Sequence, residues 1–124
     1  MNERILVIDD DPTILNLIQE LLCEEGYNVR TSTSSTLLLQ HIQRSQPDLI
    51  LVDILLEGDE GRILCRQLKA NALTKHIPVI LISAYIPWHE ALSESCADDF
   101  LPKPFTQEKL LEMIRKHLHQ RGQP

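Results

Sequence analysis

The sequence has 124 residues, of which 43% are hydrophobic and only 4% aromatic, and residues 1–124 are predicted to form a single domain with an aliphatic core. A net charge of −6 argues against direct nucleic-acid binding, because that requires lysine and arginine concentrated on one face. Without a long apolar stretch or a secretory pattern, the chain is expected to be cytoplasmic and not a membrane protein. The widely separated Cys23, Cys65 and Cys96 are predicted to be reduced and mostly buried.

The first predicted strand is the aliphatic run Ile5–Ile8. Runs without polar alternation are typical of strands that are covered on both faces of a parallel sheet. A helix is predicted next, with Asp11 as its N-cap, Pro12 at its first position and Gly26 as its stop signal. Tyr27–Thr31 is a weaker second strand.

The middle of the chain continues to alternate between helical and strand patterns. In chain order, the predicted elements are a helix at Ser35–Arg44, a strand at Leu49–Val52, a helix at Gly61–Ala72, a strand at Val79–Ile82 and a helix that starts near Trp88. Strict alternation implies right-handed crossover connections between parallel strands.

The last part of the chain supplies a short fifth strand at Asp98–Leu101 and a final helix that opens at Thr106. The count of five strands and five helices predicts an α/β fold with a doubly wound five-stranded parallel sheet. Near the end of the final helix, His117 and His119 lie two residues apart and so point to different sides. They are predicted to form a solvated helix end rather than a metal site.

Acidic residues follow two of the aliphatic strands. Asp9, Asp10 and Asp11 come directly after the first strand, and Asp53 comes directly after the third. If the two strands are neighbours, these carboxylates meet at one edge of the sheet, in the crevice where such folds bind ligands. Four carboxylates need a neutralising cation, and oxygen ligands in a shallow site favour Mg²⁺. Asp11, which precedes Pro12, is better explained as a helix cap.

Two further polar residues end the next two strands at the same edge. Ser83 ends the fourth strand, and Lys103 ends the fifth within the segment Pro102-Lys103-Pro104-Phe105. Any one of these residues alone is more often a turn, cap or surface residue. Together they indicate a functional site, in which the carboxylates would keep Lys103 charged.

With this set of residues, the sequence resembles the receiver domains of two-component response regulators over its full length. The resemblance implies the flavodoxin-like strand order 2-1-3-4-5. It also implies that Asp53 is the phosphoacceptor. The metal ion would be Mg²⁺, and the ligands that the resemblance implies are Asp9, Asp10, Asp53 and the backbone carbonyl of Leu55.

Further residues take their expected roles from the same resemblance. Ser83 matches the switch hydroxyl and, with Ala84 and Lys103, the contacts to the phosphoryl group. Phe100 matches the switch aromatic residue, which is expected to turn from an outward to an inward position. A cis peptide is expected before Pro104.

The resemblance implies a signalling domain that assists its own phosphorylation and dephosphorylation, rather than an enzyme. The phosphoryl group would come from a phosphohistidine on a histidine kinase or phosphotransfer protein. Phosphorylation would alter the face made by the fourth helix, fifth strand and fifth helix, which would contact a downstream protein or a second copy of the domain.

Three residues depart from the family's usual pattern: Glu57 stands where a proline is common, Tyr85 is bulky near the acceptor, and Cys96 replaces a small glycine. Glu57 leaves open a receiver-like interaction module that no longer turns over phosphate, although the full set of site residues argues against it. A flavin or nucleotide binder on the same architecture is disfavoured, because a phosphate-binding loop needs backbone N–H groups where this chain has three carboxylates.

Overall fold

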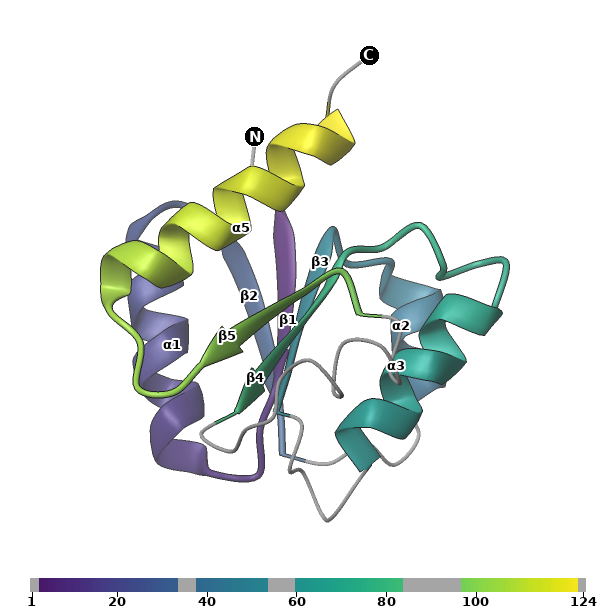
Figure 1. Ribbon diagram of the computed structural model, residues 1–124, viewed down its shortest axis with the longest axis horizontal. Coiled ribbons are helices and arrows are strands. Elements are labelled where there is room, and N and C mark those ends of the chain that lie inside the picture. Colours follow the sequence, from purple (N-terminus) through teal and green to yellow (C-terminus); the bar gives the residue numbers. More distant parts are fainter. Residues whose placement is uncertain (1–2, 34–37, 54–59, 84–96, 123–124) are drawn as a thin grey trace.

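The computed structural model describes residues 3–33, 38–53, 60–83 and 97–122. Its five parallel strands form one sheet in the order β2-β1-β3-β4-β5 (Figure 1). They are β1 (Arg4–Ile8), β2 (Asn28–Ser32), β3 (Leu49–Asp53), β4 (Val79–Ser83) and β5 (Asp99–Pro102). The predicted parallel sheet and its strand order are therefore confirmed, and each strand lies within one residue of its predicted bounds at either end.

Four of the five predicted helices fall in the part of the chain that the structure describes. They are α1 (Pro12–Glu24), α2 (Leu38–Ser45), α3 (Glu60–Ala70) and α5 (Gln107–Gly122). The helix predicted near Trp88 lies in residues 84–96, outside the described residues. The side chain of Asp11 accepts the Thr13 N–H at 2.9 Å, so Asp11 caps α1 as predicted, and Gly26 after that helix has a φ of +93° that favours glycine.

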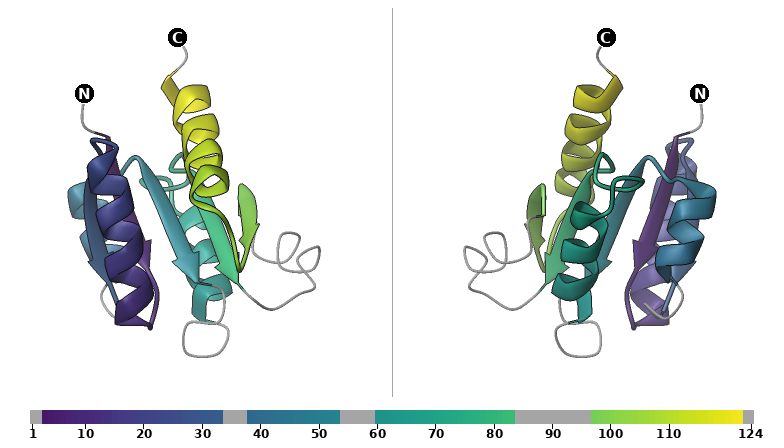
Figure 2. Two further views of the ribbon diagram at one scale, coloured as in Figure 1. Left: turned by 90° about the vertical axis from the view of Figure 1, so that its left-hand side faces the viewer. Right: turned by 90° about the vertical axis from the view of Figure 1, so that its right-hand side faces the viewer.

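Side chains that alternate along the strands build a separate apolar core on each face of the sheet. One core joins β1, β3 and β4 to α2 and α3, and its helical members include Ile42, Leu64 and Leu68. The other core joins the opposite faces of these strands to α1 and α5, and its helical members include Leu15 and Ile114. The sheet is thus the middle of three layers (Figure 2), as expected for nearly uninterrupted aliphatic strands.

Two of the sequence predictions about polar residues differ from the structure. His117 is only 8% exposed and contacts Asp99, so the predicted solvated helix end is wrong for this residue. Cys65 is buried but Cys23 is exposed, which makes the prediction of mostly buried thiols wrong for Cys23, while Cys96 lies outside the described residues.

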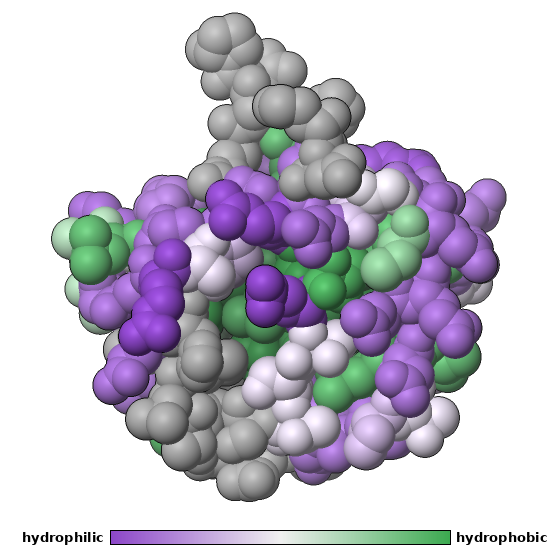
Figure 3. Space-filling view, turned by 180° about the vertical axis from the view of Figure 1, so that it is seen from behind, coloured by the Kyte–Doolittle hydropathy of each residue, from purple (hydrophilic) through white to green (hydrophobic). Residues whose placement is uncertain are grey.

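The surface matches the composition of the chain. The face opposite the view of Figure 1 is largely hydrophilic, with a smaller apolar area near its centre (Figure 3). Within the described ranges, no helix combines the length and the apolar character that a membrane span requires.

Candidate functional site

The strand register brings the predicted site residues to the carboxyl edge of the sheet. Ile8 at the end of β1 pairs with Val52, so Asp9 follows β1 at the level where Asp53 ends β3. In the next two strand pairs, Asp53 lies opposite Ile82, and Ser83 lies opposite Pro102, which directly precedes Lys103. The expected convergence at one edge is therefore present in the backbone.

Asp9 and Lys103 form the described centre of this edge. Asp9 is 3% exposed, and the Nζ atom of Lys103 lies 3.3 Å from its Oδ2 atom, although the two residues are 94 positions apart in the sequence. The other carboxylate oxygen accepts the Asp11 N–H at 3.0 Å. A buried carboxylate is stable only when it is paired and hydrogen-bonded, and both conditions are met here.

The neighbouring acidic residues have different environments. Asp10 is exposed, whereas Asp11 uses its side chain to cap α1. Asp9 and Asp10 offer carboxylate oxygens at this edge, which are ligands preferred by a hard divalent cation. Asp9 and Asp10 thus fit the predicted Mg²⁺ site, and Asp11 is confirmed as a cap.

Several predicted site residues lie outside the described part of the chain. They are Leu55 and Ala84, together with Glu57 and Tyr85 at the departures from the family pattern. For Asp53 and Ser83 the structure describes the backbone position at the strand ends. Their roles stay predictions.

Two predictions at β5 have different outcomes. The peptide bond between Lys103 and Pro104 is cis, as expected. Phe100, which was expected to start from an outward position, is 6% exposed and belongs to the core beneath α2 and α3. The side chain of Phe100 is therefore already inward in this structure, and its role as the switch aromatic stays a prediction.

An apolar groove of about 610 Å³ adjoins the site and was missed by the sequence analysis. One wall is α1, and the other is the segment that leads from Lys103 into α5. Its lining residues are Ile14, Leu17, Ile18, Leu21, Lys103, Pro104, Phe105 and Gln107. Leu17 is 60% exposed in the structure. The signal in the sequence was the large number of leucine and isoleucine residues between positions 14 and 22, which makes an unusually wide apolar stripe for one helix.

Comparison with known proteins decides the family. The model of the family described as "Response regulator receiver domain" matches residues 5–115. The chain is a response regulator receiver domain. Receivers are signalling domains and serve as phosphoacceptors in two-component systems, so this conclusion confirms the general function that the sequence predicts. Nothing in the comparisons favours the alternative of a module that no longer turns over phosphate.

Relatives of the receiver are parts of longer proteins. This chain is 38% identical over 117 residues to the response regulator PleD of Caulobacter vibrioides. The alignment covers 93% of this chain and 26% of PleD. This chain is also 32% identical over 120 residues to the DNA-binding response regulator MtrA of Mycobacterium tuberculosis. That alignment covers 95% of this chain and 51% of MtrA. The chain therefore spans a quarter to a half of these relatives.

Solved structures of similar receivers have the same fold. A response regulator of Chloroflexus aurantiacus aligns with a TM-score of 0.88 at 31% identity, covering 96% of this receiver and 99% of that chain. A second match is the receiver domain of the Pseudomonas aeruginosa histidine kinase PA1611, with a TM-score of 0.86 at 23% identity. The alignment covers 96% of this chain and 99% of the PA1611 receiver. At that identity the similarity concerns the fold alone.

Proposed function

We propose that the receiver accepts a phosphoryl group on Asp53 from a phosphohistidine donor. The observation that carries this proposal is the register: Asp53 ends β3 at the edge where the buried Asp9 contacts Lys103. A carboxylate at this position is a nucleophile beside a fixed cation. Asp9, Asp10, Asp53 and the backbone carbonyl of Leu55 would hold Mg²⁺.

The chemistry requires positioning and charge neutralisation rather than a general base, because phosphoryl transfer involves little covalent assistance from the protein. A carboxylate oxygen of Asp53 forms the new bond to phosphorus, and the bond to the histidine nitrogen of the donor breaks. Lys103 neutralises charge on the transferred phosphoryl oxygens. Bound Mg²⁺ would supply further neutralisation of the same oxygens.

A small phosphodonor with Mg²⁺, followed by intact mass measurement, tests the acceptor. The native protein should gain one phosphoryl group, and Asp53→Asn should gain none, because the amide is not an anionic nucleophile. Asp11→Asn is the matched control, since it removes a carboxylate three positions from the first strand but retains a capping side chain. It should be phosphorylated like the native protein. A full mass shift in Asp53→Asn would refute the assignment.

The Mg²⁺ site has its own test. The exposed Asp10 is proposed to be a direct ligand, so Mg²⁺ should raise the unfolding temperature of the native protein by mass action on a site that only the folded state has. The PA1611 receiver is described with a magnesium ion in its active-site cleft. NaCl at equal ionic strength should stabilise the native protein less, and Asp10→Ala should abolish the difference between the salts. Equal effects of both salts on the native protein would contradict the site.

The phosphodonor is proposed to be a histidine kinase or phosphotransfer protein that contacts the groove between α1 and the start of α5. Lys103 belongs both to this groove and to the site, so a partner that fills the groove lies next to the acceptor edge. The exposed Leu17 offers apolar area to such a partner. The face that includes β5 and α5 is proposed to contact a downstream protein or a second receiver.

The remaining predictions stay proposals of the same kind. The 124 residues are proposed to form one receiver unit that acts in the cytoplasm. The chain itself is proposed not to bind nucleic acid, in keeping with its net charge of −6.

A further inference from the structure

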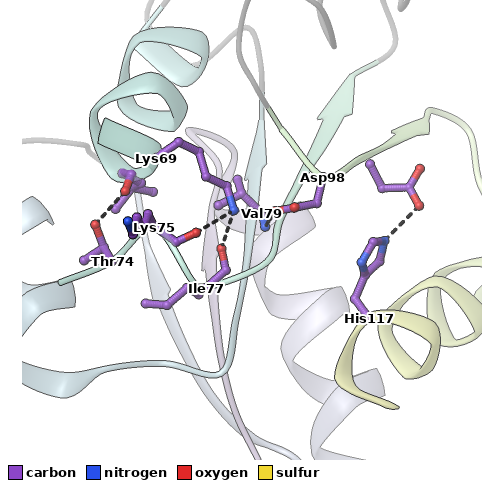
Figure 4. A network of polar contacts seen from close by, with 9 residues as sticks. Lys69, Thr74, Lys75, Ile77, Val79, Asp98 and His117 are labelled. Atoms are coloured by element: carbon purple, nitrogen blue, oxygen red, sulfur yellow. Dashed lines mark hydrogen bonds and ion pairs between the residues drawn. The ribbon is translucent and has the colours of Figure 1, made fainter. Parts of the chain in front are cut away.

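The beginning of β5 is attached to helices on both faces of the sheet, through two consecutive aspartates. Asp98 contacts Lys69 at the end of α3, and Asp99 contacts His117 on α5 (Figure 4). Neighbouring residues of a strand point to opposite faces, which is why two adjacent carboxylates reach helices in different layers. β5 is an edge strand and pairs with β4 on one side. The two aspartate contacts therefore add attachments that strand pairing does not provide.

On the α3 side, the Lys69 ammonium contacts three acceptors. The ammonium of Lys69 lies 2.6 Å from Asp98, 2.8 Å from the carbonyl of Ile77 and 3.2 Å from the carbonyl of Lys75. The same Asp98 oxygen accepts the Val79 N–H at 2.8 Å. A lysine ammonium has three N–H donors, so these acceptors use all of them.

The contact on the α5 side involves a histidine, a side chain that can be neutral or charged. One Asp99 oxygen lies 2.9 Å from Nε2 of His117 and 3.6 Å from the ammonium of Lys116. The other oxygen accepts the backbone N–H of Phe100 at 2.9 Å. A single carboxylate therefore links α5 to the backbone of the predicted switch aromatic.

The pKa of Asp99 is consistent with its hydrogen bond to His117. Partial burial by itself raises the pKa of Asp99, but hydrogen bonds from His117 and from the Phe100 backbone, with the charge of Lys116, bring the pKa below its usual value. Asp99 from β5 contacts His117, and Lys116 from the same helix as His117 contacts the same Asp99 oxygen. Arg115, one position before Lys116, instead contacts Glu25 after α1.

We propose that the Asp99–His117 contact is a proton-sensitive brace that ties the position of Phe100, and with it the response to phosphorylation, to pH. This inference rests on the proposed phosphorylation switch, in which the inward position of Phe100 belongs to the activated state. An imidazole protonated at Nε2 donates a hydrogen bond to Asp99, and in the imidazolium the same hydrogen bond becomes charge-assisted. Acid therefore strengthens the brace and favours the inward position of Phe100.

The brace itself can be tested without any phosphoryl group. The Phe100 amide resonance should move in ¹H–¹⁵N spectra recorded from about pH 5.5 to 8, the range in which histidine titrates. His117→Gln retains an amide donor but removes the titration, so the movement should vanish. Lys69→Gln and Lys116→Gln alter nearby fixed charges and should preserve it. A Phe100 amide that titrates equally in His117→Gln would overturn the brace.

The coupling to activation is tested with beryllofluoride and Mg²⁺, which together mimic the phosphoryl group. Linkage requires that a proton that favours the activated state also tightens the binding of the mimic. From about pH 7.5 to 6, the affinity of the native protein should rise by about two- to fivefold relative to that of His117→Gln, the range of a partly exposed ion pair.

The outcomes separate this inference from the proposed function. Parallel pH dependence of the affinity in the native protein and in His117→Gln would overturn the coupling and leave Asp53 as the acceptor. Failure of beryllofluoride to bind either protein would instead contradict the proposed phosphoacceptor site, and the coupling with it, because the inference rests on that site.

Discussion

The two ends of β5 use the same pair of residue types for different purposes. At the amino end, the ammonium of Lys69 is 2.6 Å from Asp98 and also meets two backbone carbonyls. At the carboxyl end, the ammonium of Lys103 is 3.3 Å from Asp9, at the edge where the phosphoryl group is proposed to bind. The Lys69 contact fixes the backbone, whereas we propose that Lys103 shares its charge with a phosphoryl group. A lysine–aspartate pair therefore indicates function by its position at the ligand edge of the sheet rather than by its residue types.

The largest effect is expected at the carboxyl end. Replacing Lys103 with methionine removes the cation that faces the transferred oxygens, so phosphoryl gain from a small donor should slow by a factor on the order of 10². Rates are measured by intact mass against time in Mg²⁺. Lys69→Met is the control from the amino end of β5 and should keep the native rate. If both variants lost activity equally, the proposed difference between the two ends would be wrong.

A charge introduced into the groove should affect only transfer from a protein donor. Leu17→Glu puts an unpaired carboxylate where a partner would bury the 60% exposed Leu17, so phosphotransfer from a cognate phosphohistidine protein should fall about tenfold. Phosphorylation by a small donor should not change. Leu73→Glu is a matched control, because Leu73 is 61% exposed but lies after α3. A similar loss in both variants would argue against docking in the groove.

At the amino end the expected effect is on stability. Lys69→Met leaves the Asp98 carboxylate and two carbonyls without their shared donor, and the free energy of unfolding should fall by about 1–3 kcal/mol. Urea unfolding measures the change. The control is Lys75→Met, since Lys75 is exposed and contributes its backbone carbonyl to the cluster. Equal unfolding midpoints for Lys69→Met and the native protein would show that the cluster adds nothing to stability.

The sequence predicted the sheet well, because its evidence is local. Aliphatic runs such as Leu49–Val52 have one stable environment, the centre of a covered parallel sheet, and Asp11 before Pro12 is a strong cap signal. Position directly after a strand also predicted that Asp9 and Lys103 would meet. The order of the strands came from the resemblance to a family.

The contacts that sequence reasoning missed depend on tertiary packing. His117 was interpreted as solvated because a histidine near a helix end usually is, and only the approach of β5 brings Asp99 within 2.9 Å of it. The groove likewise requires α1 and the Lys103–Phe105 segment, which are far apart in the sequence, to lie side by side. The inward position of Phe100 follows from its side of β5, which faces the core beneath α2 and α3.

The smallest effect is expected for Asp99, in acid. Its pKa is lowered in the folded state from the ordinary value of 3.8, so its carboxylate stabilises the fold above that value, and the contribution is lost as the pH falls through the folded pKa. Asp99→Asn should therefore remove a stabilisation on the order of 0.2–1 kcal/mol near neutral pH and make unfolding less sensitive to acid below about pH 4. Urea unfolding at the two pH values measures both differences. Asp48→Asn, which retains an acceptor for the Arg4 N–H at the amino end of β1, is the control for a general loss of charge. If Asp99→Asn and Asp48→Asn had the same acid dependence, net charge rather than the pairing of Asp99 with His117 would explain the result.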